Sequence, residues 1–201
     1  MPWLPERPMW VEWMPADAAL SLASRSLELA DDAVAKGDHP FGAVLLFPPG
    51  DPVAQTASRG PALPGCQKCG SDNYLVLEAL NGVVTGCDVT RHAELCLVSA
   101  AWRLLSPEQL AGAVLVTSTE PCAMCSGAIY WSGVKAVLYA CPAPRLDVHA
   151  GPSLRCHSAQ VFDGAVSAPV SLSLDHLGSP GRALAARAED QHRIYWPSLE
   201  N

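Results

Sequence analysis

Two cysteines stand three residues apart in residues 117–131, TSTEPCAMCSGAIYW, directly after a proline. This spacing alone suits a disulfide, a redox pair, two core residues or two metal ligands. Pro121 is typical of the first turn of a helix, and Thr119 can cap that helix from just outside it. Cys122 and Cys125 would then lie on one face of the first turn. Because the unpaired N–H groups there stabilise thiolates, the pair can bind a zinc ion.

A third ligand and a base stand in residues 90–96, TRHAELC. His92 lies near the start of a second expected helix, and Glu94 follows two residues later. One neutral imidazole and two thiolates leave the fourth position of a zinc ion open, which is the stoichiometry of a catalytic site. Water at that position becomes acidic, and Glu94 can take its proton if the carboxylate points toward the water.

The composition is that of an acidic globular protein, because 49% of the 201 residues are hydrophobic and the net charge is −7. The 13 Lys and Arg residues are dispersed, so we do not expect a nucleic-acid partner. The N-terminus lacks the apolar run of a signal peptide, and no run of 18 apolar residues occurs, so we expect a cytoplasmic protein without a membrane segment. In a reducing compartment, the eight cysteines favour thiols or metal ligands over disulfides.

Helix and strand patterns alternate along the chain. Helical patterns cover residues 16–38, 92–105, 122–133 and 181–196, and strand patterns cover 41–47, 74–80, 111–118, 135–140 and 168–174. The alternation predicts a three-layer α/β/α sandwich with a central, mostly five-stranded mixed sheet. We expect an N-terminal arm rich in Pro and Trp over residues 1–15 and a single domain over residues 16–201. Within this domain, the Pro- and Gly-rich segment at about 51–73 is expected to be a loop insertion.

A second Cys-x-x-Cys motif, Cys66 and Cys69, lies inside this insertion and is flanked by glycines as in a zinc knuckle. Two more ligands would be needed, and no matching Cys-x-x-Cys motif stands elsewhere. The residues that could in principle supply them are Cys87, Cys141, Cys156 and His157. We favour a loop with two free thiols and expect one catalytic zinc ion per chain. Two zinc ions per chain would indicate a structural site instead.

His-Ala-Glu followed by Pro-Cys-x-x-Cys is the signature of zinc deaminases, and the chain resembles the cytidine deaminase superfamily. The segments PFGAVLL, RHAEL, TSTEPCAMCSGAIYW and KAVLYA look most like the guanine deaminase and nucleobase deaminase branch, to which the tRNA adenosine deaminases are related. The resemblance extends from about residue 16 to residue 141 and is interrupted at the insertion. It implies that His92, Cys122 and Cys125 bind zinc and that Glu94 is the proton shuttle.

The same resemblance implies where the base binds. The family places a base-binding asparagine eleven residues before the histidine, and Asn81 stands at that spacing. Its amide can donate to one ring acceptor and accept from one N–H, although an Asn-Gly pair also suits an ordinary turn. The other residues expected to contact the substrate are Phe41, Ala93 and Trp131, with His39 at the border of the pocket. For Phe41 and Trp131 the alternative is a place in the core, which is more common for aromatic residues at the ends of strands and helices.

Two late segments bear on the choice of substrate. Guanine deaminases carry a late acidic residue that helps to hold the base. The candidates for its place here are Asp147, Asp163, Ser158 and Gln160. In related enzymes the C-terminal tail closes over the active site, sometimes from the neighbouring subunit, and Tyr195 or Trp196 could do so here. A terminal helix packed on the body of the protein is the alternative.

These features predict a zinc-dependent hydrolytic deaminase of a small nucleobase, with guanine converted to xanthine and ammonia. Cytosine-like and amino-triazine rings share the reactive amidine carbon and stay open as substrates. A tRNA adenosine deaminase, disfavoured by the net charge, and a guanosine or cytidine deaminase are alternatives. A non-catalytic scaffold of the same fold is a further alternative, against which the complete set of His92, Glu94, Cys122 and Cys125 argues. The resemblance also implies a homodimer.

Overall fold

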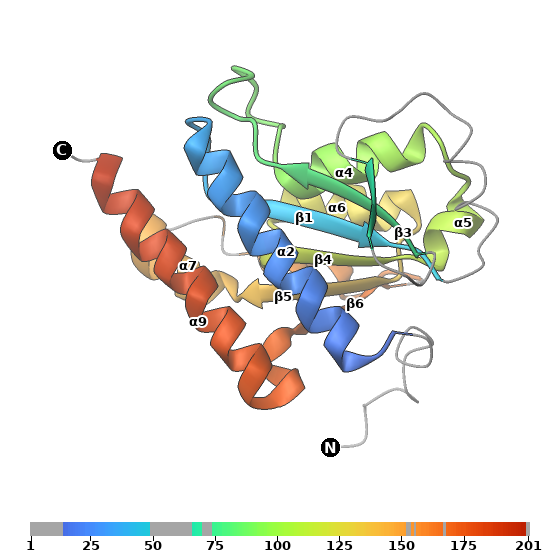
Figure 1. Cartoon of the computed structure of the whole chain (residues 1–201). Helices are drawn as coiled ribbons and strands as arrows, with labels where there is room; N and C mark the ends of the chain where they lie inside the picture. The colour runs from blue at the N-terminus through green and yellow to red at the C-terminus, as the bar shows by residue number, and fades with distance from the viewer. Residues whose placement is uncertain are drawn as a thin grey trace.

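The computed structural model describes residues 14–48, 66–69, 74–151, 154, 156–166 and 168–199 (Figure 1). Its strands are β1 (Gly42–Leu46), β2 (Cys66–Cys69), β3 (Tyr74–Leu80), β4 (Val114–Thr119), β5 (Ala136–Cys141) and β6 (Val170–Ser173). Its helices are α2 (Ala16–Ala35), α4 (Ala93–Trp102), α5 (Pro107–Ala111), α6 (Ala123–Ser132), α7 (Ala143–Ala150), α8 (Ser158–Phe162) and α9 (Gly178–Tyr195), with 3-10 turns η1 (Leu174–Leu177) and η2 (Trp196–Leu199). The arm predicted for residues 1–15 lies outside the described residues up to position 13.

The described strands form one mixed sheet in the order β2-β3-β1-β4-β5-β6. β1 is antiparallel to β3 and β4, whereas β4, β5 and β6 are parallel to one another. The five predicted strands are present, and β2 is a sixth. The prediction of a loop over residues 51–73 is therefore wrong at Cys66–Cys69, because this segment is a strand that pairs antiparallel with β3. Backbone groups form this ladder, so a segment without a strand-like apolar pattern can complete the sheet.

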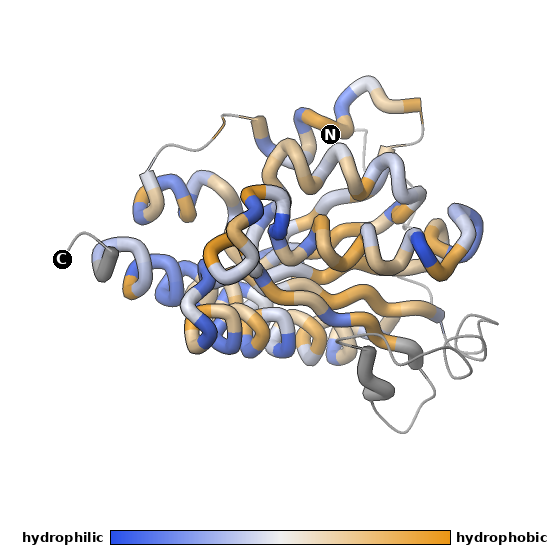
Figure 2. The backbone as a smooth tube through the Cα atoms, turned by 90° about the horizontal axis from the view of Figure 1, so that it is seen from above, coloured by the Kyte–Doolittle hydropathy of each residue, from blue (hydrophilic) through white to orange (hydrophobic). Residues whose placement is uncertain are grey.

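Helices cover both faces of the sheet, which confirms the predicted three-layer sandwich. α2 and α9 pack on one face, and α4 and α6 pack on the other (Figure 1). Figure 2 shows the strands as a largely hydrophobic layer between the helices. None of the helices in the described ranges is long and apolar enough to cross a membrane.

Strand β1 is buried on both faces, which explains its continuous apolar sequence. Ala43 and Leu45 belong to the core beneath α4 and α6, whereas Val44 and Leu46 belong to the core beneath α2 and α9. At the start of the strand, a side chain at Gly42 would collide with the backbone of α2. Glycine therefore lets this helix lie directly on the sheet.

The register brings three chain segments to one edge of the sheet. Because β1 is antiparallel to both neighbours, its beginning lies beside their carboxyl ends, with Gly42 opposite Leu80 and Ala43 opposite Thr117. The residue before β1, the loop after β3 and the loop after β4 therefore meet at this edge. The loop after β3 leads into α4 and the loop after β4 leads into α6, so two helices begin at the same place.

The short helices α5, α7 and α8 are not among the predicted elements. Each has between five and eight residues, which is too few to show a helical repeat in the sequence. Capping interactions mark two of them instead. Ser106 and Gln109 form a capping box at the start of α5, and the side chain of Gln160 accepts from the backbone of His157 at the start of α8.

Candidate metal centre

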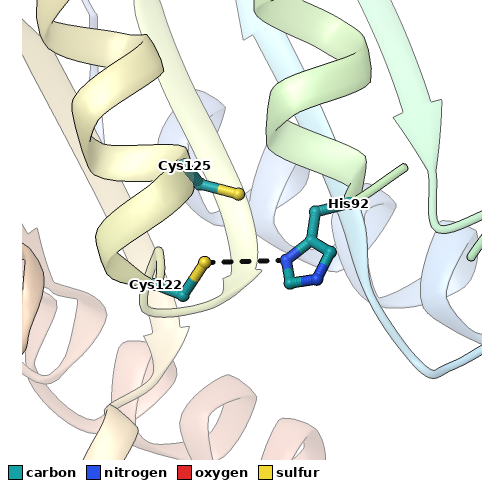
Figure 3. A group of neighbouring side chains, drawn as sticks. All are labelled: His92, Cys122 and Cys125. Carbon is teal, nitrogen blue, oxygen red and sulfur yellow. Dashed lines mark hydrogen bonds between the residues drawn. The ribbon is translucent and has the colours of Figure 1, made fainter. Parts of the chain in front are cut away.

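The three predicted metal ligands face one another at the starts of two helices (Figure 3). His92 is the N-cap of α4 and Cys122 is the N-cap of α6, both with extended backbone. Cys125 lies in the first turn of α6 and is buried. The cap predicted for Thr119 is wrong, because β4 continues to Thr119, which pairs with Cys141 in the sheet. Cys122 occupies the cap position itself, and Pro121 precedes the helix.

The ligand atoms are spaced for a zinc ion. A ring nitrogen of His92 and the Sγ atoms of Cys122 and Cys125 all lie within 4.8 Å of one another. Nδ1 of His92 lies 3.6 Å from Sγ of Cys122. Tetrahedral zinc with Zn–S bonds of about 2.3 Å needs ligand separations of roughly 3.5–3.8 Å. The group can therefore hold zinc after small side-chain movements, with one coordination position left for water or substrate.

The electrostatics of this group favour a thiolate. A hydrogen bond from the Cys125 thiol, together with the nearby His92 ring, lowers the pKa of Cys122 to about 4. The same hydrogen bond raises the pKa of Cys125, and the contact with Cys122 raises the pKa of His92. One sulfur is thus ionised at neutral pH, which is the form that binds metal ions.

Glu94 is buried in the first turn of α4 beside the ligands. Its Oε1 lies 3.1 Å from Oγ1 of Thr117, and its Oε2 lies 3.6 Å from Sγ of Cys125. Burial raises the pKa of Glu94. Oγ1 of Thr117 is also 3.2 Å from the carbonyl oxygen of Gly42, so its single proton can serve only one of these acceptors. A protonated Glu94 can donate to Thr117 and an ionised one can accept from it, so both states of a proton shuttle find a partner.

Asn81 and Phe41 lie next to each other, close to the candidate metal ligands. The backbone N–H of Asn81 donates to the carbonyl oxygen of Phe41 at 2.9 Å, and the Phe41 ring is parallel to the His92 ring within 3°, with centroids 6.4 Å apart. Asn81 is fully buried, and its Oδ1 accepts from the backbone of Val83. Its Nδ2 has no hydrogen-bond partner among the described residues. Ala93, buried as the first residue of α4, separates His92 from Glu94.

Comparison with known proteins decides the family. The model of the cytidine and deoxycytidylate deaminase zinc-binding region matches residues 17–141. The chain belongs to this family. The resemblance predicted from the motifs is thereby confirmed, and zinc is the metal for which the His92, Cys122 and Cys125 group is suited.

Individual relatives of the deaminase family match about three fifths of the chain. The guanine deaminase of Bacillus subtilis (strain 168) is 46% identical over 117 residues, which are 58% of this chain and 60% of the relative. The tRNA-specific adenosine deaminase of the same strain is 37% identical over 120 residues, 60% of each protein. The chain thus spans about three fifths of the length of these curated relatives. A solved guanine deaminase structure from Nitrosomonas europaea shares the fold, with a TM-score of 0.59 over 86% of this chain and 84% of that one, at 22% identity.

The last described helix of the chain and the turn after it reach the same edge of the sheet. The Trp196 ring lies 5.2 Å from the His39 ring and 6.3 Å from the Phe41 ring, measured between centroids. The Tyr195 ring lies 6.0 Å from the His39 ring. The His192 ring lies 5.2 Å from the Phe41 ring. The structure therefore brings His39, Tyr195 and Trp196 to Phe41, and it adds His192, which the sequence patterns do not single out.

Other predicted site residues lie elsewhere. Trp131 is 78% exposed, nine residues after Cys122 in α6, which corresponds to roughly 14 Å along the helix axis. It lines a groove with Trp102 between α6 and α4. Asp147 is half-buried on α7, which packs against α9. Asp163 is exposed at the end of α8.

Glu120 is a buried part of the deaminase motif that sequence reasoning missed. Its carboxylate accepts hydrogen bonds from the backbone N–H of Ser158 at 3.1 Å, the hydroxyl of Ser158 at 2.8 Å and the backbone N–H of Ala143 at 3.0 Å. It thus ties the starts of α7 and α8 to the loop that carries Cys122. Ser158 and Gln160 are accordingly engaged in holding α8. A charged residue two positions before a metal ligand was the available sequence signal.

Proposed function

We propose that this protein is a zinc-dependent hydrolytic deaminase that converts free guanine to xanthine and ammonia. The observation that carries the proposal is the buried Glu94 carboxyl beside His92, Cys122 and Cys125, with hydrogen-bond partners for both of its protonation states. The 46% identity to the guanine deaminase of Bacillus subtilis supports guanine as the base.

The residues divide the chemistry among them. Zinc, when bound, supplies the Lewis acidity that makes water acidic enough to lose a proton near neutral pH. Glu94 takes that proton and transfers it to a ring nitrogen of the base. It then takes the second proton, from the hydroxyl group added to the ring carbon, and delivers it to the amino group, which leaves as ammonia while the C–OH becomes a carbonyl. Thr117 orients the Glu94 carboxyl through its hydroxyl. The N–H groups at the starts of α4 and α6 favour negative charge developing between them.

The base would lie flat between Phe41 and His92. A ring inserted between two parallel rings needs about 7 Å, twice the optimal contact distance of about 3.5 Å between carbon atoms. The centroid separation of 6.4 Å is an upper limit on the gap between the two ring planes, so the rings would have to move apart slightly to admit the base. Asn81 would donate its unpartnered Nδ2 to an acceptor on the base, which would remove the unfavourable state of a buried N–H group without a partner.

Ammonia release by zinc-loaded protein tests this proposal. We would compare guanine, cytosine, adenine, the amino-triazine ammeline, guanosine and cytidine, and we expect guanine to be turned over fastest. Glu94→Gln, which keeps the size of the side chain, should lower kcat by about 10²–10⁴ while zinc stays bound. Full activity of Glu94→Gln would contradict the role of Glu94. Turnover of cytosine or ammeline in place of guanine would show that the proposed substrate is wrong. No ammonia release from any of the compounds would refute nucleobase deamination.

A tRNA adenosine deaminase is the second candidate, favoured by the 37% identity to the Bacillus subtilis enzyme. The net charge of −7 opposes it, because binding to a phosphate backbone needs clustered basic residues. Inosine formation in a tRNA anticodon stem-loop, measured beside guanine turnover, separates the two. Inosine formation without xanthine formation would replace the first proposal by this one.

We further propose a homodimer that forms through the outer faces of α4 and α6. Trp131 is 78% exposed and Trp102 is 47% exposed, and both line a groove of about 590 Å³. Arg103 is the only charged residue in its lining as described, so two acidic copies can meet here without bringing carboxylates of the groove together. Light scattering should give the mass of a dimer, and Trp131→Glu should give a monomer. A dimer that survives this substitution would place the interface elsewhere.

The remaining expectations complete the proposal. We take residues 16–201 as a single domain and the cytoplasm as its compartment, because thiolate ligands require reducing conditions. We also propose one catalytic zinc ion per chain. Metal analysis of purified protein tests this number, and two zinc ions per chain would reopen a structural site at Cys66 and Cys69.

A further inference from the structure

His192 is a buried polar residue that the proposed reaction does not yet use. It stands near the end of α9 and is 1% exposed. Its Nε2 lies 2.7 Å from Oγ1 of Thr119. Its Nδ1 is buried and has no hydrogen-bond partner among the described residues. A buried ring nitrogen without a hydrogen-bond partner costs free energy unless a ligand supplies that partner.

The environment of Thr119 decides which nitrogen of His192 carries the proton. Thr119 is also buried, and within the described ranges the only recorded partner of its hydroxyl is Nε2 of His192. The hydroxyl proton is satisfied only if Thr119 donates it to Nε2. Nε2 is then the acceptor, and Nδ1 of the neutral ring carries the N–H. Burial keeps the ring neutral, because it lowers the pKa of His192 to about 4.

His192 also adjoins the pocket in which the base is proposed to lie. Its ring contacts the Phe41 ring at a centroid distance of 5.2 Å, and Phe41 is the ring parallel to His92. Thr119 is the last residue of β4, three positions before Cys122. His192 and Asn81 therefore both flank Phe41, and each holds one buried nitrogen without a partner.

We propose that His192 is a specificity-determining residue whose Nδ1–H donates a hydrogen bond to an acceptor on the edge of the bound base. On guanine this acceptor is the 6-oxo group or N7. The inference rests on the proposed function, because it names how the same pocket selects oxopurines. A base with an amino group at that edge would place its N–H donor against the Nδ1–H donor of His192, so it is rejected. A base with C–H in place of the acceptor cannot form the hydrogen bond and is rejected too.

Two substitutions separate the nitrogens of the imidazole. His192→Asn places an amide N–H near the position of Nδ1, whereas His192→Gln extends its amide toward Thr119, near the position of Nε2. We expect His192→Asn to retain most of kcat/KM for guanine and His192→Gln to lose about tenfold. Arg193→Ala, on the exposed face of the same helix, is the matched control and should behave as the unmodified protein does.

Base analogues identify the acceptor atom. The unmodified protein should discriminate about tenfold against either 2,6-diaminopurine, which lacks the 6-oxo group, or 7-deazaguanine, which lacks N7. His192→Gln should abolish that discrimination, and His192→Asn should keep it. The affinity of 8-azaguanine and of these analogues for zinc-loaded Glu94→Gln protein, measured by calorimetry with and without the His192 substitutions, gives the same comparison without turnover.

The outcomes distinguish this inference from the proposed function. If the unmodified protein releases ammonia from guanine and discrimination against both analogues is unchanged in His192→Gln, the role of His192 is refuted while the function stands. The same holds if His192→Gln retains more guanine activity than His192→Asn. If no base is deaminated by the unmodified protein, the function fails and the inference fails with it.

Discussion

Asp38 joins the turn after α2 to the loop between β3 and α4, and replacing it with alanine tests that link. The carboxylate is 1% exposed. Its Oδ1 accepts from the backbone N–H groups of Val84 and Thr85 at 2.8 and 3.0 Å, and its Oδ2 accepts from the Thr85 hydroxyl at 2.6 Å. The same loop begins at Asn81 and ends at His92. Asp38 therefore holds the chain between a proposed base-binding residue and a predicted metal ligand.

The size of the effect follows from the number and exposure of these hydrogen bonds. A hydrogen bond to a charged group contributes about 1.5–3 kcal/mol when both partners are buried. Val84 is 50% exposed, so the freed N–H groups can turn to water and the three contributions do not add fully. We expect Asp38→Ala to lower the free energy of unfolding by about 3 kcal/mol and Tm by roughly 6–12 °C for a chain of this size. KM for guanine should rise about tenfold, because Asn81 loses its fixed position.

Thermal unfolding and steady-state kinetics measure both effects, with Asp38→Asn as the matched variant. Its amide oxygen still accepts from the loop, so Tm and KM should fall between the values of the other two proteins. Unchanged Tm and KM in Asp38→Ala would refute the reasoning.

The pH dependence of the Asp38 contribution has a definite sign. Burial alone would raise the pKa of Asp38, but the hydrogen bonds from Thr85 and Val84 outweigh it and lower the pKa below its usual value. The stabilisation is therefore present above about pH 4 and is lost as the pH falls through the folded-state pKa. The difference in unfolding free energy between Asp38→Ala and the unmodified protein should narrow below about pH 4.

Four further predictions follow from other contacts. Arg25→Met leaves the buried Glu78 without its bidentate partner and should lower the unfolding free energy in urea by about 3 kcal/mol; additional replacement of Glu78 by Leu should restore most of it. Glu120→Ala should weaken zinc binding about 10- to 100-fold in a chelator competition, because the loop before Cys122 loses its anchor; unchanged affinity would contradict this. Thr117→Val should lower kcat about tenfold at constant KM, and a changed KM alone would argue against its contact with Glu94. Dipicolinate should abolish ammonia release and lower Tm, and zinc but not magnesium should restore both.

Several features of this protein were readable from the sequence because each depends on local spacing. Ligands at an N-cap and in the first turn of one helix must share a face, so Cys122 and Cys125 could be paired from the interval between them. A strand buried on both faces appears as an uninterrupted apolar run, as β1 does. Pairing His92 with these cysteines came from recognising two motifs together, because a sequence separation of 30 between His92 and Cys122 carries no geometric information.

Other features were decided by long-range contacts that leave no periodic pattern. Strand β2 exists because β3 offers it an edge, and α7 and α8 begin where Glu120 accepts their first N–H groups. Trp131, an aromatic residue inside the strongest motif, faces outward because α6 turns its ligand-bearing start toward the site and its far end away. The interval in sequence says nothing about this direction.

The sequence by itself determined the family, the layered α/β architecture, the three candidate metal ligands and the carboxylate expected beside them, since these rest on short-range spacing and on recognised motifs. Only the tertiary structure decided which polar groups close the site. Asp38, Thr117 and Glu120 become functional candidates through partners that the antiparallel register and the two helix starts bring to one edge of the sheet. His192 joins them because α9 returns across the sheet to Phe41 and Thr119. An unpartnered nitrogen indicates a ligand only where it is buried, and burial is a property of the packed chain.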